Sequence, residues 1–183
     1  NPKDKGGFIP VDFHYSITLG EIVKNLLLFR DSRTSLETQD VGSGFKRALY
    51  STYMSFLPKE EFAYRIETHS DERGEFAEVL RTKRSGQFSY FTTNPGVTRG
   101  VHYHHSKSEK FLVIKGKALF KFRNLINNEE YEIIATGESP QIVESIPGWV
   151  HSITNIGNEE MFTMLWANEN FDPDHPDTIT SEI

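Results

Sequence analysis

Three histidines and one glutamate in this sequence have the spacing of a metal site. His102 and His104 lie two residues apart, Glu109 follows after a short polar stretch, and His151 comes some forty residues later. On a strand, residues two apart point to the same face, about 7 Å along. Neutral imidazoles and a carboxylate that face one interior are ligands for zinc, iron, nickel or manganese. The set predicts a divalent-metal site with room for a substrate.

The remaining composition is consistent with this site. The chain has no cysteine, so a transition-metal site must use His, Asp and Glu. A single inward histidine is more often a core residue than a ligand. A core role is harder to assign to two histidines on one strand face that are accompanied by a carboxylate and a third histidine. His14, His69 and His175 have no such partners, and we expect them to be surface or structural residues. His105 should point away from His104 if the strand persists.

The elements that must position these residues are short strands. From about Phe62 onward the sequence shows alternating runs separated by turn residues, at the spacing of an all-β sandwich or barrel. We expect Gly116 and the stretch "NIGNEE" to mark two hairpins. Eight runs are candidate strands: "EFAEVLRT", "GQFSYFTTN", "EKFLVIKG", "KALFKFRN", "EEYEIIATG", "QIVESIP", "HSITNIG" and "EMFTMLWANE". They predict a mainly β protein, a jelly-roll barrel closed by an acidic tail.

Two short amphipathic helices are expected before the barrel. "SITLGEIVKNLLLFRDSR" begins with a capping box of Thr18 and Glu21. "GFKRALYSTYMSFLP" has a second helical period that Pro58 ends. The apolar face of the first helix consists of Leu19, Ile22, Val23, Leu26 and Leu27. Two such helices cannot form a core alone, so we expect residues 1–58 to be the tail of an upstream domain with its linker, and residues 59–183 to form the barrel.

Composition and charge limit the class of protein. The 183 residues are 13% aromatic, which favours a packed core over disorder. The formal net charge of −6 argues against a nucleic-acid partner. No apolar run is long enough to span a bilayer, and no signal peptide is visible. We therefore expect a cytoplasmic protein with no membrane partner.

Two stretches resemble the motifs of the cupin family. "GVHYHHSKSEKFLVIKG" fits the first cupin motif, with its His-x-His, a glutamate after four residues and a closing glycine. "IPGWVHSITN" is similar to the second motif, although Pro147 directly precedes Gly148 instead of lying two residues before it. The resemblance implies a double-stranded β-helix, here preceded by two short helices. It also implies a bound divalent metal, for which we expect zinc.

A second resemblance concerns nucleotide-sugar 3,5-epimerases. "DERGEF" and "GVTRGVHYH" resemble two segments of that family, in which the histidine after Arg-Gly is the general base and aligns with His102. The tyrosine that donates a proton in that family has no match here. We expect Arg73 and Arg99 in these segments to bind the diphosphate of a substrate. Trp149 is a candidate pocket residue, with a core role as the alternative, and Glu78 is a weaker candidate.

The most extensive resemblance is to the carboxy-terminal cupin domain of bifunctional capsular polysaccharide enzymes of the CapF type. It covers nearly the whole chain, including "FIPVDFHYSITLGEIV", which is similar to the end of their short-chain reductase half. It implies that the chain inverts carbon 3 of a UDP-4-keto-6-deoxy-N-acetylhexosamine, on the way to UDP-N-acetyl-L-fucosamine. It also implies an upstream reductase domain that uses NADPH, and a homodimer formed through the cupin.

The proton-transfer residues are open at this point. If the histidines and Glu109 bind a metal, they are not free to act as bases, and Tyr103, His105 and Lys110 are the neighbouring candidates. Two other functions compete with the epimerase. The first is a dimerisation or regulatory module with a structural metal, which would show no proton exchange. The second is an iron-dependent oxygenase, which would consume oxygen.

Overall fold

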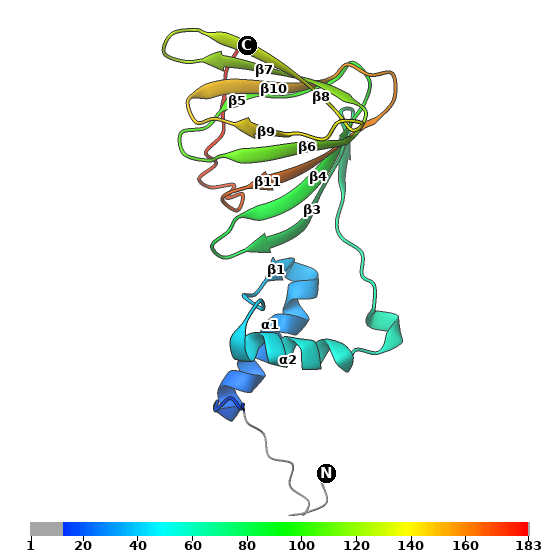
Figure 1. Ribbon diagram of the computed structural model, residues 1–183, viewed down its shortest axis with the longest axis vertical. Coiled ribbons are helices and arrows are strands. Elements are labelled where there is room, and N and C mark those ends of the chain that lie inside the picture. The colour runs from blue at the N-terminus through cyan, green and yellow to red at the C-terminus, as the bar shows by residue number, and fades with distance from the viewer. Residues whose placement is uncertain (1–12, 183) are drawn as a thin grey trace, which may run out of the picture.

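The computed structural model describes residues 13–182. The start of the reductase-like stretch, residues 8–12, lies outside them. Figure 1 shows two helices at one end of a strand barrel. The helical elements are α1 (Leu19–Ser35), α2 (Gly44–Ser55) and the short 3₁₀ helix η1 (Lys59–Glu61). The strands are β1 (Glu37–Thr38), β2 (His69–Asp71), β3 (Gly74–Thr82), β4 (Gln87–Thr93), β5 (Thr98–Tyr103), β6 (Glu109–Lys115), β7 (Lys117–Asn124), β8 (Glu130–Thr136), β9 (Ile142–Ser145), β10 (Trp149–Asn155), β11 (Met161–Ala167) and β12 (Ile179–Thr180).

Both predicted helices are present, and the first begins where its sequence indicates. The Thr18 hydroxyl accepts a hydrogen bond from the N–H of Glu21 at 3.2 Å, and the Glu21 carboxylate accepts from the N–H of Thr18 at 3.1 Å. This reciprocal pair satisfies two backbone donors that a helix start leaves free. The helices contact each other through Phe29 of α1, which is buried against Tyr50 and Tyr53 of α2.

The predicted apolar face of α1 is only partly covered by the described part of the chain. Leu19, Val23 and Leu27 are exposed, with 77% of Leu19 accessible, whereas Ile22 and Leu26 are half-buried.

None of the helices among the described residues is long and apolar enough to cross a membrane.

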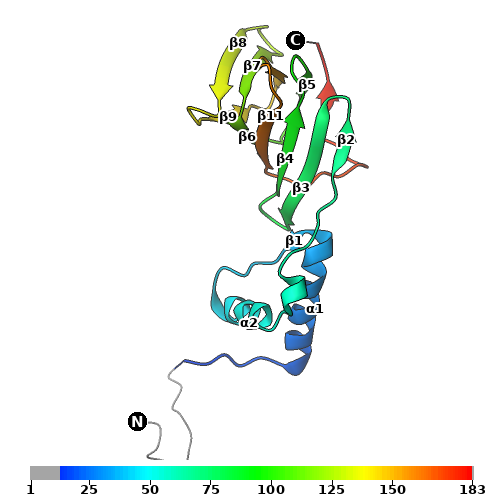
Figure 2. The same cartoon turned by 90° about the vertical axis from the view of Figure 1, so that its right-hand side faces the viewer.

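The helices are attached to the barrel by one short strand. β1 pairs in parallel with the end of β3, with Glu37 opposite Arg81 and Thr38 opposite Thr82. The N–H of Arg81 also donates to the carbonyl oxygen of Leu36 at 2.8 Å. The carboxyl end of α1 is therefore held beside the barrel edge, as Figure 2 shows from the side.

The strands form two sheets, and all eight predicted strands are confirmed as β3, β4 and β6 to β11. One sheet has the order β1-β3-β4-β11-β6-β9, with β2 beside β3, and the other has the order β12-β5-β10-β7-β8. Of the other four strands, β5 is expected only through the spacing of His102 and His104. The short strands β1, β2 and β12 are not predicted, because two or three residues carry no readable alternation. The core lies between the sheets and consists mainly of Phe91, Phe111, Val113, Phe120, Phe122, Ile153 and Met161.

The two expected hairpins are wrong. Gly116 joins β6 to β7 and "NIGNEE" joins β10 to β11, but in each case the two strands belong to different sheets. In a jelly roll, successive strands can alternate between sheets, so a tight turn is a corner here. Gly116 is required at its corner, because it has a φ of +92° and a Cβ there would lie 3.0 Å from the Cα of Met161.

Candidate metal centre

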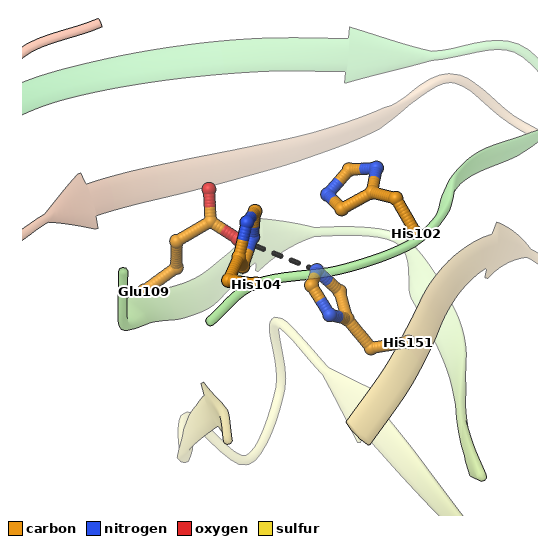
Figure 3. Close-up of side chains that lie close together, drawn as sticks. All are labelled: His102, His104, Glu109 and His151. Atoms are coloured by element: carbon orange, nitrogen blue, oxygen red, sulfur yellow. Dashed lines mark hydrogen bonds and ion pairs between the residues drawn. The ribbon is translucent and has the colours of Figure 1, made fainter. Parts of the chain in front are cut away.

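His102 and His151 face each other across two neighbouring strands. They are register partners in the antiparallel pair β5–β10, and their ring centroids are 4.7 Å apart. A bulge at this point shifts the register between His151 and Ser152, and Val101 has a φ of +62°. Such a bulge re-aims the side chains beside it. Here it brings His102 to the interior position opposite His151 (Figure 3).

His104, in the loop after β5, and Glu109, the first residue of β6, complete the cluster. The Glu109 Oε2 atom lies 3.1 Å from Nε2 of His104 and 3.3 Å from Nε2 of His151. His104, Glu109 and His151 are buried, and His102 is half-buried. One potential ligand atom from each of the four residues lies within 4.8 Å of the others. Atoms around one ion at about 2.0–2.2 Å are at most about 4.4 Å apart, so a small side-chain adjustment suffices to bind an ion.

The hydrogen bonds of His104 favour a cation in this cluster. Its Nδ1 contacts the main-chain oxygen of Asp177, which can only accept, so Nδ1 carries the proton. In the neutral ring, Nε2 then presents a lone pair to the Glu109 oxygen, which is also an acceptor. A cation between the two atoms removes this conflict. The buried Nδ1 of His151 has no hydrogen-bond partner in the described residues. The four residues therefore fit a divalent metal, and their number does not identify which one.

Burial and the neighbouring histidines keep His102 neutral. Burial, followed by the charges of the neighbouring His151 and His104, lowers the pKa of His102 to about 4. Burial raises the pKa of the Glu109 carboxyl, but its contacts with the His104 and His151 rings outweigh this effect and hold that pKa below its usual range. A neutral imidazole and an ionised carboxylate are the forms that bind metal.

We expect the free energy of unfolding of the metal-free protein to fall as the pH decreases from about 6.5 to about 4. The pKa of His102 is about 4 in the folded protein and about 6.5 in the unfolded chain. In this window the unfolded state binds a proton that the folded state does not, so acid favours unfolding. Allowing for the partial exposure of His102, the loss is about 1–2 kcal/mol.

Urea unfolding at pH 7 and pH 4.5, after chelation, measures this loss. His102→Gln should reduce the difference between the two pH values, whereas the exposed His14→Gln should leave it unchanged. A wild-type stability that does not change across the window would contradict the neutral state of His102.

A large cavity leads to the cluster. It has a volume of about 900 Å³ and is lined by residues of α1, the linker before β2, the sheet that contains β3, β4, β6 and β11, and the tail. Glu109 and Lys107 line it on the side of the metal site, and Phe76 and Leu165 form part of its apolar wall. Charged residues of both signs surround it: Arg33, Arg65, Arg81, Glu67, Glu78 and Glu169.

Three predicted proton-transfer residues lie away from this cavity. Lys110 is exposed and forms an ion pair with Glu144 of β9. Tyr103 alternates with His102 along β5, and its ring contacts the exposed His105 at 5.5 Å. The structure therefore does not support a role in proton transfer for Tyr103, His105 or Lys110.

The predicted substrate-binding residues do not line the cavity, although Arg73 and Arg99 both lie beside Asp71. Arg73 is largely exposed and forms an ion pair with Asp71, which lowers the pKa of that carboxyl to about 2. The Arg99 guanidinium lies over the ring of Phe91 at 5.4 Å, and burial lowers its pKa. Trp149 packs against the core, as in its alternative reading.

Glu78 lines the cavity, where it binds the Arg81 guanidinium through two hydrogen bonds of 2.5 and 2.6 Å. Of the polar residues singled out from the sequence for substrate contact, it is therefore the one on the cavity wall.

Sequence reasoning missed Lys107 and Asp177. Lys107 is buried with 8% exposure, lines the cavity and donates from Nζ to the Thr178 hydroxyl at 3.0 Å. Its place in the loop between two metal-binding residues was the available signal. Asp177 lies more than seventy residues from the loop that it contacts, so no local pattern could have indicated it.

A two-sheet barrel with three histidines and a glutamate at its inner wall defines a cupin with a candidate metal site. The family described as "Polysaccharide biosynthesis C-terminal domain" matches residues 69–179. The chain belongs to this family and corresponds to the cupin region of CapF-type enzymes.

Three relatives are similar to this chain. The UDP-2-acetamido-2,6-beta-L-arabino-hexul-4-ose reductase of Pseudomonas aeruginosa is 57% identical over 96% of this chain and 47% of its own length. The capsular polysaccharide assembling protein CapF of Staphylococcus aureus is 39% identical, with a TM-score of 0.92 over 100% of this chain and 49% of that one. The spore coat polysaccharide biosynthesis protein SpsL of Bacillus subtilis is 28% identical over 60% of this chain and 79% of its own. These comparisons confirm the cupin fold, and the chain spans about half the length of the first two relatives.

Proposed function

We propose that this chain is the epimerase half of a bifunctional nucleotide-sugar enzyme. It inverts carbon 3 of a UDP-4-keto-6-deoxy-N-acetylhexosamine, on the way to UDP-N-acetyl-L-fucosamine for capsule or O-antigen. The observation that carries the proposal is the buried cluster of three histidines and one glutamate beside a cavity of about 900 Å³. The name of the Pseudomonas relative, a reductase of a UDP-linked hexul-4-ose, supplies the substrate class.

The chemistry needs a stabilised enolate. The hydrogen on carbon 3 becomes acidic when negative charge on the adjacent ketone oxygen is stabilised. A divalent ion held by His102, His104, Glu109 and His151, for which zinc is our first choice, would supply Lewis acidity at that oxygen. The Lys107 ammonium, buried at the same end of the cavity, would add a fixed positive charge. The apolar side chains of Phe76 and Leu165 would exclude water from the reacting carbon.

The rim of the cavity suits the nucleotide part of the substrate. Arg33 and Arg65 line it, and the Arg33 guanidinium lies 4.5 Å from the ring centroid of Tyr64. Planar guanidinium groups bind diphosphate oxygens well, and an aromatic ring offers a stacking surface to a base. Arg73 and Arg99 remain proposed contacts from the epimerase-like segments.

The remaining expectations stay proposals. These are an upstream reductase that uses NADPH, a homodimer through the cupin, and a cytoplasmic location. The alternative function, a dimerisation or regulatory module, predicts that the metal affects assembly and that no proton exchange occurs.

Deuterium incorporation tests the proposal. The full-length protein, with no nicotinamide cofactor added, is incubated with the keto sugar in deuterated water, and exchange at carbon 3 is followed by NMR. We expect exchange with metal present and its loss after chelation, with recovery when the ion is restored. No exchange under either condition would reject the epimerase and favour the regulatory module. Oxygen consumption would point to the oxygenase.

A further inference from the structure

The carboxy-terminal segment returns across the metal site. β12 pairs antiparallel with β5, with Ile179 opposite Tyr103 and Thr180 opposite His102. Asp177, just before β12, therefore lies against the loop that connects His104 to Glu109. This loop connects two of the four cluster residues. A contact that holds the loop in one conformation therefore also holds His104 and Glu109 in position.

The Asp177 carboxylate holds this loop through four hydrogen bonds. It accepts from the N–H groups of His105 at 2.8 Å, Ser106 at 2.7 Å and Lys107 at 2.8 Å, and from the Ser106 hydroxyl at 3.0 Å. The hydrogen bond from the His105 N–H is the main reason why the pKa of Asp177 lies well below its usual range. Hydrogen bonds to an ionised acceptor are about twice as strong as neutral ones.

The same segment contacts two functional side chains. The main-chain oxygen of Asp177 accepts from Nδ1 of His104, which leaves Nε2 free to face Glu109. The hydroxyl of Thr178 accepts from Nζ of Lys107 at 3.0 Å. Two adjacent tail residues therefore touch a metal ligand on one side and the cationic side chain of the cavity on the other.

We propose that Asp177 is a positioning residue for the metal site, and that residues 177–180 form a latch that keeps the site preorganised. The inference rests on the metal centre of the proposed function. The hydrogen-bond partner of a ligating histidine determines its tautomer and ring orientation. By holding the loop in one conformation, the carboxylate also removes the ordering cost that ion binding would otherwise meet.

Metal affinity is the direct test. We expect Asp177→Ala in the full-length protein to weaken zinc binding by about 10–100-fold. Without the carboxylate the loop of residues 105–107 no longer holds residue 177 in place, and the main-chain oxygen of that residue is the outer partner of His104. Competition with a chromophoric chelator measures the affinity. The visible spectrum of bound Co²⁺ reports ligand geometry, which a merely structural role would not change. Asp177→Asn keeps one acceptor oxygen and should lose less affinity.

The control is Asp174→Ala, which removes an exposed carboxylate three residues away and should bind zinc within twofold of wild type. Wild-type affinity and an unchanged Co²⁺ spectrum in Asp177→Ala would overturn the latch. If Asp177→Ala does not fold, the test uses Asp177→Asn. Zinc affinity equal to that of wild type in the folded Asp177→Asn protein would also overturn the latch.

The outcomes separate this inference from the proposed function. A wild-type protein that binds no divalent ion would reject both. Weakened metal binding in Asp177→Ala, together with a wild-type enzyme that exchanges no deuterium at carbon 3, would support the latch and reject the epimerase.

Discussion

Replacement of Glu109 by Gln is expected to weaken metal binding by more than about 100-fold and to abolish deuterium exchange at carbon 3. Glu109 is the single anionic ligand of the cluster, and one of its oxygens lies within 3.3 Å of both His104 and His151. The amide of Gln is neutral, and its NH₂ group can only donate, so the charge that holds a divalent ion is lost. The loss of metal affinity should be larger than that expected for Asp177→Ala, because Asp177 acts on the metal only through a ligand.

The measurement combines metal content after dialysis with the exchange assay at a saturating concentration of the ion. Glu159→Gln is the matched control, because this exposed glutamate on the outer surface pairs with Lys115. Exchange that persists in Glu109→Gln, with no metal bound, would show that the metal does not take part in the reaction. Unchanged affinity would exclude Glu109 as a ligand.

Lys107→Met is expected to lower the rate of exchange by about 10²–10³-fold while leaving metal bound. Removal of one group that stabilises a developing oxyanion costs about this much in other enzymes. Lys107 is buried, lines the cavity beside Glu109, and has its ammonium group held by Thr178. In this low-dielectric setting a fixed positive charge acts more strongly on the enolate than it would in water.

Three further variants make the Lys107 prediction specific. Lys107→Arg keeps the charge with a different geometry and should recover part of the rate. Lys115→Met, on the exposed surface, should exchange at the wild-type rate within twofold. Lys110→Met tests the candidate chosen from the sequence. If Lys107→Met binds less metal, and its exchange rate falls only in proportion to the metal lost, Lys107 has a structural role.

The sequence by itself determined eight of the strands and the four residues of the histidine–glutamate cluster. Alternation with a period of two identifies a strand from within its own residues, and all eight predicted strands are present. The spacing of His102, His104 and Glu109 is local, so it too can be read along the chain. Thr18 and Glu21 marked the start of α1 for the same reason, because a capping box is a contact three residues long.

Only the tertiary structure decided which residues surround that cluster. Periodicity shows that a segment is a strand but not which strand it pairs with, so it predicts a hairpin at Gly116, where the chain in fact passes from one sheet to the other. Lys110 is nearer to Glu109 in sequence than Lys107 is, yet Lys110 at the start of β6 is exposed and Lys107 in the loop is buried. Asp177 reaches the site because β12 pairs with β5 across more than seventy residues. Pairing over such distances depends on the free energy of the whole packed barrel, which no local stretch of sequence contains.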